Sequence, residues 1–217
     1  MADPASRSGR HYFDADILEF AARVHAPHDT ALARAFDAPA AHGLPAIQLA
    51  ASEARAVELF LRLAGARKVI ELGTLAGYSA LRIARALPLD GLLVTVEASD
   101  THADIAEANL AAAALVVAVR VARGKALDVL PTLEAEGPWD AIFIDADKGN
   151  YDRYGRWAAQ NLRPGGLLLA DNVYLFGRLL EDSAEAEAMR RFHEESAAAF
   201  DTVCLPTPDG LLLGLRR

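Results

Sequence analysis

Cysteine is almost missing from this chain of 217 residues, which has a single cysteine, Cys204. An internal disulfide is therefore excluded. Cys204 lies in the strand-like stretch "TVCLP", so we expect a reduced, buried thiol rather than a nucleophile. Positive charge is also scarce, because 22 lysines and arginines stand against 30 aspartates and glutamates, a formal net charge of -8. This balance argues against a nucleic-acid partner, which would normally meet a basic face.

Long apolar runs are missing too. The longest, "LAAAALVVAV" from Leu110, is far shorter than the roughly 20 residues that span a bilayer. The amino-terminal stretch "MADPASRSGRHYF" has no apolar core, so no signal peptide is predicted. With 53% hydrophobic and 24% charged residues, the composition is that of a globular protein. We expect a soluble, cytoplasmic protein without a membrane segment, and a single domain over residues 1–217.

Helical patterns fill the first third of the chain. Apolar residues recur there at intervals of three and four, and Pro27, Pro39 and Pro45 are expected to break the segments. Ser52 with Glu53 marks the expected start of the third helix. The predicted helices cover residues 14–25, 28–38 and 51–64.

From Lys68 onward, strand patterns alternate with helical ones. The predicted strands are "KVIEL", "GLLVTVE", "VRVAR", "DAIFID" and "GGLLLAD". The predicted helices are 77–87, 101–112, 125–135, 150–161 and about 184–199. Apolar strands separated by helices indicate a parallel sheet covered on both faces. The final runs "TVCLP" and "GLLLGLRR" flank the hairpin-type turn "TPDG", so the last strand should be antiparallel. We predict an α/β, doubly wound, Rossmann-like core at 66–217 with a helical extension at 1–65.

The first two strand ends suggest a nucleoside cofactor, because ligands of such a sheet bind outside the carboxyl ends of its strands. "VIELGTLAGYS" places Glu71 before a loop bracketed by Gly73 and Gly77. Glu97 ends the next strand, where a ribose-binding acid belongs in this fold. A pyrophosphate would favour a third glycine and no adjacent carboxylate. S-adenosylmethionine (SAM), a phosphate-free sulfonium cation, fits better; an NAD(P)-dependent Rossmann-type oxidoreductase and an ordinary strand-to-helix turn remain the alternatives.

Charged and polar residues also follow the fourth and fifth predicted parallel strands. "IFIDADK" brings Asp145, Asp147 and Lys148 after one strand, and "LLLADNVY" brings Asp171 and Asn172 after the other. Two carboxylates and an amide oxygen at neighbouring strand ends are suitable ligands for Mg²⁺. The alternative is that the two aspartates cap helices and Asn172 forms a turn. We favour the metal because both strand ends lie beside the cofactor loop.

Together these motifs resemble the cation-dependent O-methyltransferases of the catechol and caffeoyl-coenzyme A type. The likeness runs from Val69 onward and is carried by "VIELGTLAGYSALRIARALP", "VTVEAS", "WDAIFIDADKGNYDRY", "LRPGGLLLADNV" and "DGLLLGLRR". It implies a Rossmann-like methyltransferase that moves the methyl group of SAM to a hydroxyl of a small, catechol-like aromatic substrate. It also implies Mg²⁺, or else Mn²⁺ or Ca²⁺, and a homodimer. A SAM-binding protein without catalytic activity is the other alternative.

The resemblance assigns cofactor contacts residue by residue. The residues implied are Glu71, Gly73, Thr74, Ser79, Glu97, Ala126, Asp145 and Asp147. Among them, Gly73, Thr74 and Ser79 would hold the methionine end of SAM, Glu97 would accept the ribose hydroxyls, and Ala126 would lie along the adenine. Before the third helix the sequence departs from the family, which commonly has methionine where this chain has Gln48, so that end of the cofactor pocket is expected to differ.

The resemblance also assigns the chemistry. Asp145, Asp171 and Asn172 match the metal ligands, and Lys148 matches the general base. A phenol with a pKa of about 10 is a poor nucleophile at neutral pH, and a bound cation would stabilise the phenolate as a Lewis acid. Lys148 would accept the proton. The alternative for Lys148 is a structural salt bridge to Asp147 or Asp145.

Overall fold

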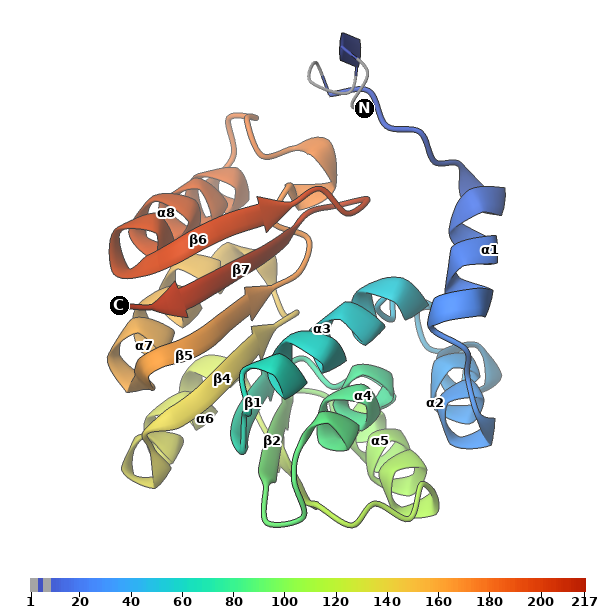
Figure 1. The fold of residues 1–217 in the computed structure, drawn as a ribbon. Coiled ribbons are helices and arrows are strands. Elements are labelled where there is room, and N and C mark those ends of the chain that lie inside the picture. Colours follow the sequence, from blue (N-terminus) through green and yellow to red (C-terminus); the bar gives the residue numbers. More distant parts are fainter. Residues whose placement is uncertain (1–3, 6–8) are drawn as a thin grey trace.

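The chain is built around one sheet. The computed structural model describes residues 4–5 and 9–217; residues 1–3 and 6–8 of the predicted amino-terminal extension lie outside the described part. Over residues 9–217 the sheet has seven strands in the order β3-β2-β1-β4-β5-β7-β6 (Figure 1). The strands are β1 (Lys68–Leu72), β2 (Leu92–Glu97), β3 (Ala118–Arg123), β4 (Trp139–Ile144), β5 (Leu162–Ala170), β6 (Phe200–Leu205) and β7 (Leu211–Arg216).

The strand directions confirm the predicted fold class. Strands β1 to β5 are parallel to one another, and β7 runs antiparallel to both β5 and β6. From β1 the order runs one way through β2 to β3 and the other way through β4 to β5. The sheet therefore has a topological switch point between β1 and β4, which is where ligands of doubly wound sheets bind.

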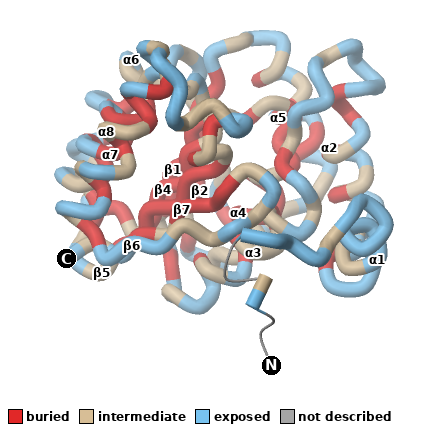
Figure 2. Tube along the Cα trace, turned by 90° about the horizontal axis from the view of Figure 1, so that it is seen from above, coloured by how far each residue is buried: buried red, intermediate tan, exposed pale blue. Residues whose placement is uncertain are grey.

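Helices cover both faces of the sheet. They are α1 (Ala15–His25), α2 (Thr30–Ala41), α3 (Ala51–Leu63), α4 (Tyr78–Ala86), α5 (Asp100–Ala112), α6 (Ala126–Leu133), α7 (Tyr151–Asn161) and α8 (Ala184–Ala199). Figures 1 and 2 show α6, α7 and α8 on one face and α3, α4 and α5 on the other, with the buried strands between them. This arrangement explains why the parallel strands are apolar on both sides.

Two apolar cores result from the alternation of side chains along each strand. In β4, Ile142 and Ile144 belong to the core beneath α7 and α8, together with Tyr151. Ala141 and Phe143 belong to the opposite core, which the helices α2 to α5 complete. Each face of the sheet is thereby closed, and the carboxyl ends of the strands are left as the edge available to ligands.

Among the α-helices of the described residues, α1 is the least embedded in the body. None of its residues is buried, and Figure 1 shows it standing beside the body of the protein, next to α2. The exposed fractions of Ile17, Phe20 and Val24 are 49%, 59% and 48%. The helix thus presents apolar side chains to solvent. Across the described residues, no helix combines the length and the apolar composition that crossing a membrane requires.

Two details of the amino-terminal helices differ from the prediction. Pro39 lies inside the last turn of α2 and does not break it; a proline removes one N–H donor, and the burial of Pro39 near the helix end offsets that loss. Helix α3 begins at Ala51, with Ala50 at the N-cap position and no side-chain cap. Ser52 and Glu53 are therefore inside the first turn, where an acid is still favourable to the helix dipole.

Candidate active site

The predicted site residues converge because three backbone hydrogen bonds extend the parallel ladder past the ends of the strands. Leu72, Ile144 and Ala170 lie opposite one another in β1, β4 and β5. The next residue of each strand continues the pattern: the N–H of Asp145 donates to Leu72, and that of Asp171 donates to Ile144. Likewise, the N–H of Gly73, the first residue after β1, donates to the backbone oxygen of Val96 in β2. The first residues after three strands thus form one row.

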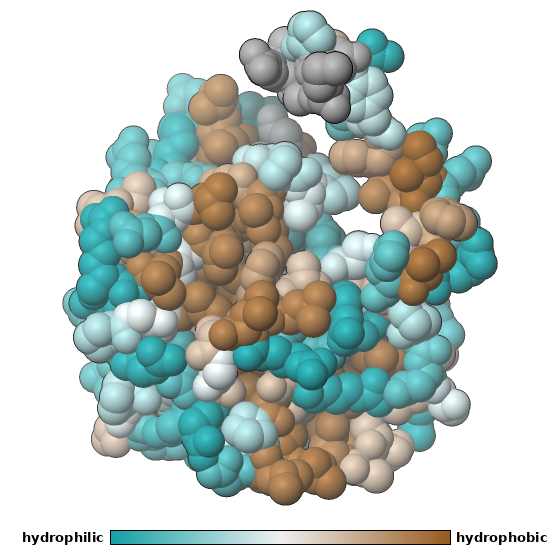
Figure 3. All heavy atoms as spheres, viewed as in Figure 1, coloured by the Kyte–Doolittle hydropathy of each residue, from teal (hydrophilic) through white to brown (hydrophobic). Residues whose placement is uncertain are grey.

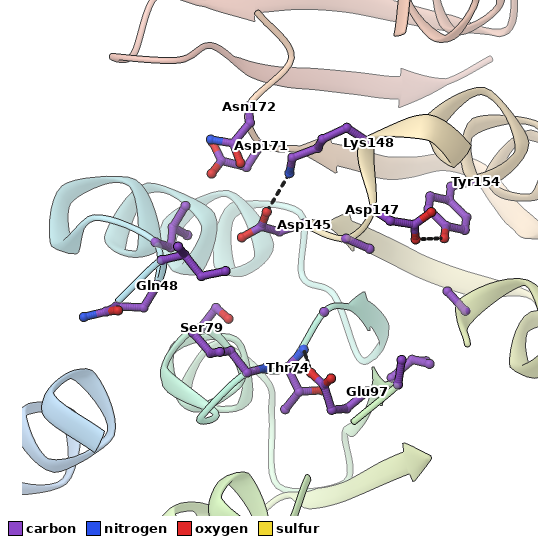
Figure 4. A pocket seen from close by; sticks show the side chains of 18 of the residues that line it. Gln48, Thr74, Ser79, Glu97, Asp145, Asp147, Lys148, Tyr154, Asp171 and Asn172 are labelled. Carbon is purple, nitrogen blue, oxygen red and sulfur yellow. Dashed lines mark hydrogen bonds and ion pairs between the residues drawn. The ribbon is translucent and has the colours of Figure 1, made fainter. Parts of the chain in front are cut away.

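A cavity of about 1180 Å³ opens over this row. Every predicted site residue except Glu71 lines it. Figure 4 shows two groups of side chains facing each other: Thr74, Ser79 and Glu97 on one side, and Lys148 with the two strand-end aspartates and Asn172 on the other. The predicted cofactor loop and the predicted metal ligands therefore line one cavity. Its volume is large enough for small-molecule ligands.

The cofactor loop is held by Glu97. One carboxylate oxygen, Oε2, accepts the backbone N–H groups of Thr74 at 3.1 Å and Leu75 at 2.9 Å, and Oε1 accepts that of Ser99 at 2.9 Å. Leu75 has a left-handed backbone with φ of 48°, which costs energy for a non-glycine residue and is offset by this bond. Glu97 thus fixes the loop conformation, and its contact with the ribose stays a prediction.

Gly73 is required by the neighbouring strand as well as by the loop. Its φ is +95°, and a Cβ atom there would lie 1.9 Å from the backbone oxygen of Asp145. A side chain at this position is therefore excluded. Gly77, with φ of +85°, is the N-cap of α4. Both bracketing glycines have backbones that favour glycine.

Glu71 lies beneath the loop and does not line the cavity. Its side chain is fully buried, and its Oε2 accepts the hydroxyl of Thr95 at 2.5 Å. Burial raises the pKa of Glu71 to about 8, although the hydroxyls of Ser79 and Thr95 act in the opposite direction. Glu71 is thus protonated over most of the neutral range in the cofactor-free protein. Its predicted role toward the cofactor stays a prediction.

We expect the stability of the cofactor-free protein to report this proton. The folded pKa is about 8, above the ordinary value of 4.5, so the folded protein binds a proton that the unfolded chain lacks between these values. Stability should therefore fall as pH rises from about 5 to 8, by up to about 1.4 kcal/mol per pH unit from this group. Glu71→Gln should flatten the dependence, as measured by urea unfolding at several pH values. An unchanged slope would contradict a protonated Glu71.

The side of the cavity formed by Asp145, Lys148, Asp171 and Asn172, called the metal side below, contains a buried carboxylate oxygen without a hydrogen-bond partner in the described part of the chain. Asp171 is 4% exposed, and its Oδ1 atom is buried with no hydrogen-bond partner among the described residues. Burial raises the pKa of Asp171 to about 7, and the charges of Asp145 and Glu53 add to this effect. Asn172 has a left-handed backbone with φ of 56°, a conformation that asparagine tolerates. The two carboxylates and the amide oxygen fit a hard divalent cation, which would relieve the charge at Asp171.

Of the alternative interpretation, the turn at Asn172 is present, because the N–H of Leu175 donates to the Asn172 carbonyl at 2.9 Å, but the helix caps are not. The N-caps of the helical segments that follow the two strand ends are Asp147, Asn150 and Tyr174. Neither Asp145 nor Asp171 caps a helix. Within the described part of the chain, no three or more His, Cys, Asp or Glu side chains form a group that could hold a metal. The candidate site therefore depends on the amide oxygen of Asn172.

Lys148 and Asp147, which adjoin in sequence, have different partners. The Nζ atom of Lys148 lies 2.9 Å from Oδ1 of Asp145, so the salt bridge considered as an alternative is present, and it is made to Asp145. Asp147 instead accepts the hydroxyl of Tyr154 at 2.5 Å and the side-chain amide of Asn150. Figure 4 shows Lys148 directed toward the metal side and Asp147 directed away from it.

The structure adds residues to the site that sequence reasoning did not identify. Glu53, Tyr154 and Asp209 line the cavity, and Tyr151 lies buried behind Lys148. The sequence had indicated Glu53 only as part of a helix start. Its pKa is raised, chiefly by burial and further by the negative charges of Asp145 and Asp209. The spacing of three between Lys148 and Tyr151 was the available signal for that contact. Nothing local in the sequence distinguishes Asp209.

A mostly parallel seven-stranded sheet over residues 9–217, with an antiparallel β7 and a cofactor-sized cavity at the carboxyl ends of β1, β2, β4 and β5, defines a Rossmann-like methyltransferase. The model of a family described as O-methyltransferase matches residues 24–217. The chain thus belongs to the O-methyltransferase family and is a SAM-dependent O-methyltransferase. This assignment decides against the Rossmann-type oxidoreductase.

Curated relatives and solved structures agree with the family. The chain is 43% identical over 170 residues to a catechol O-methyltransferase from Niastella koreensis, covering 76% of this chain and 77% of that protein. It is 40% identical over 198 residues to a catechol O-methyltransferase from Mycobacterium tuberculosis, covering 87% and 90%. An O-methyltransferase from Bacillus cereus in complex with SAH superposes with a TM-score of 0.88 at 36% identity, covering 93% of this chain and 97% of the other.

Proposed function

We propose that this enzyme methylates one hydroxyl of a small aromatic substrate with two neighbouring hydroxyl groups, and that it requires a divalent cation. The observation that carries the proposal is the unpartnered, buried Oδ1 of Asp171, set beside Asp145 and Asn172 in the cavity that also holds the cofactor loop. A cation held by these residues would supply Lewis-acid stabilisation of a phenolate oxygen. The names of the two bacterial relatives, both catechol O-methyltransferases, support the same substrate class.

The residues of the chain divide the work. The loop at Gly73 and Thr74, with Ser79 and Glu97, would hold SAM so that its methyl group lies at the metal side of the cavity. Asp145, which lies between the cofactor loop and the other metal ligands, would contact both SAM and the cation. Lys148 would take the proton of the acceptor hydroxyl, because its Nζ lies at the metal side of the same cavity. Such positioning of two reactants is a main source of rate in transfer reactions.

The proposal is tested by matched acceptors. With SAM and Mg²⁺ present, we expect methylation of a 1,2-dihydroxybenzene and little methylation of its 1,3- and 1,4-isomers, because a single cation can contact both oxygens only when they are adjacent. The measurement is product formation by mass spectrometry, with calorimetric titration of SAM as the control for an intact cofactor site. Equal rates for the three isomers would contradict a metal-bound vicinal diol.

A homodimer and a cytoplasmic location stay predictions. The exposed apolar side chains of α1, among them Ile17 and Phe20, give the homodimer a physical basis, since apolar surface of this kind favours association. Figure 3 shows apolar residues exposed on the side of the molecule where α1 stands. Sedimentation velocity should give the mass of two chains, and Phe20→Glu should shift the population toward one. A wild-type protein of one chain at micromolar concentration would contradict the homodimer.

A further inference from the structure

The hydroxyl of Tyr151 is the second anchor of Lys148. Nζ of Lys148 lies 2.8 Å from the Tyr151 oxygen and 2.9 Å from Oδ1 of Asp145. Tyr151 is fully buried at the start of α7, and its ring packs edge-on against Phe192 with centroids 5.4 Å apart. The tyrosine oxygen is therefore a fixed point, whereas lysine has a flexible four-carbon side chain.

The direction of the hydrogen bond between the two side chains follows from the other contacts of Tyr151. Its hydroxyl lies 2.9 Å from the backbone oxygen of Asp171 and 3.3 Å from that of Ile144. A phenol has one proton to donate, and a carbonyl oxygen can only accept. Tyr151 donates to the backbone and hence accepts from Lys148.

Both anchors of Nζ are thus acceptors, and together they fix two of the tetrahedral positions around the nitrogen. The position that remains is then fixed as well. Lys148 lines the cavity, so its nitrogen is held at the wall of the space that a bound acceptor would occupy.

We infer that Tyr151 is a positioning residue that fixes the direction in which Nζ of Lys148 meets the acceptor hydroxyl. The inference rests on the proposed function, because it requires Lys148 to be the base. Without the phenol oxygen, only Asp145 holds Nζ, and the nitrogen can rotate about its terminal bond. Nζ then has the required orientation toward the acceptor for only part of the time.

The test is a double-mutant cycle with Tyr151→Phe and Lys148→Met at saturating Mg²⁺. Tyr151→Phe should lower kcat by about 5- to 30-fold, the scale of one lost hydrogen bond at a reacting group, with both KM values within about twofold. In the Lys148→Met background the same change should alter kcat by less than about twofold, since the base is already absent. Equal losses in both backgrounds would overturn the inference and show a structural role.

A second variant separates the two bonds of the hydroxyl if Tyr151→Phe does not fold. Replacing Tyr151 by 3,5-difluorotyrosine keeps the ring and the hydroxyl but makes the oxygen a weaker acceptor and the O–H a stronger donor. We expect kcat to fall while the Mg²⁺ concentration for half-maximal rate is unchanged. An unchanged kcat, or a shift in the Mg²⁺ requirement alone, would show that Tyr151 serves only the backbone of Asp171. If Lys148→Met leaves the rate intact, the base assignment fails first, and that outcome is distinct from additivity in the cycle.

Discussion

Lys148→Met is expected to lower the methylation rate by about 10²- to 10⁴-fold, the typical contribution of a general base. Methionine has a similar length and can occupy the same space, but it cannot accept the proton. Cofactor affinity should be unchanged, because Lys148 lies on the metal side of the cavity. Lys68→Met is the matched control and should retain the rate, because Lys68 is at the amino end of β1, away from the cavity at the carboxyl ends of the strands.

The contact between Lys148 and Asp145 makes a second measurement necessary. A lysine that only neutralises Asp145 would also lower activity when removed, through altered metal affinity. The two roles differ in their dependence on the acceptor, because an acidic hydroxyl needs less help to lose its proton. We therefore expect plots of log rate against acceptor pKa, at fixed pH, to converge for wild type and Lys148→Met toward nitro-substituted catechols. Parallel plots would assign Lys148 a purely electrostatic role.

Asp171→Asn is expected to reduce turnover by at least about 100-fold, since even the partners of metal ligands are worth 10- to 100-fold. Chelation with EDTA should abolish the activity of the wild-type enzyme, and Mg²⁺ or Mn²⁺ should restore it. The variant should not respond to either cation at concentrations that saturate the wild type. A wild-type enzyme fully active after exhaustive chelation would contradict the metal site.

The same substitution should stabilise the metal-free protein. The pKa of Asp171 in the folded state is about 7, above the ordinary value of 3.8, so its contribution to stability is lost as pH rises through 7. At pH 8, Asp171→Asn removes that buried charge, and the free energy of unfolding should rise by a few kcal/mol, at about 1.4 kcal/mol per unit of pKa difference. Asp140→Asn is the contrasting control. Asp140 accepts backbone N–H groups from Arg67 and Lys68, so its loss should lower stability and leave the metal requirement intact.

Much of this arrangement was predictable from local patterns. Apolar strands that alternate with helices indicated the parallel sheet, and the rule that ligands bind at the carboxyl ends of strands brought Asp145, Asp171 and the loop at Gly73 to one edge. The structure confirms the sheet and the proximity of these residues. These features were accessible because each depends on the period of a strand or on the residue that follows it.

Other features were not predictable because they depend on tertiary partners. Glu97 has its carboxylate turned to the N–H groups of its own cofactor loop, which no spacing indicates. Glu71 adjoins the loop in sequence yet points beneath it, since alternation along β1 sets its face. Pro39 continues a helix because its burial outweighs a local propensity. In each case a contact with a distant segment overrides the local signal.

The collision that a side chain at position 73 would make has a consequence for how enzymes of this kind diversify. A Cβ atom at position 73 would lie 1.9 Å from the backbone oxygen of Asp145, so the separation between the predicted cofactor loop and the predicted metal ligands is set by main-chain atoms. Ile47 and Phe176 line the cavity and are exposed to solvent, so substitutions at this rim can reshape the entrance without altering that separation. Substrate range and reaction geometry are thereby free to evolve independently, and a search for variants with new acceptors should vary the rim and keep position 73 constant.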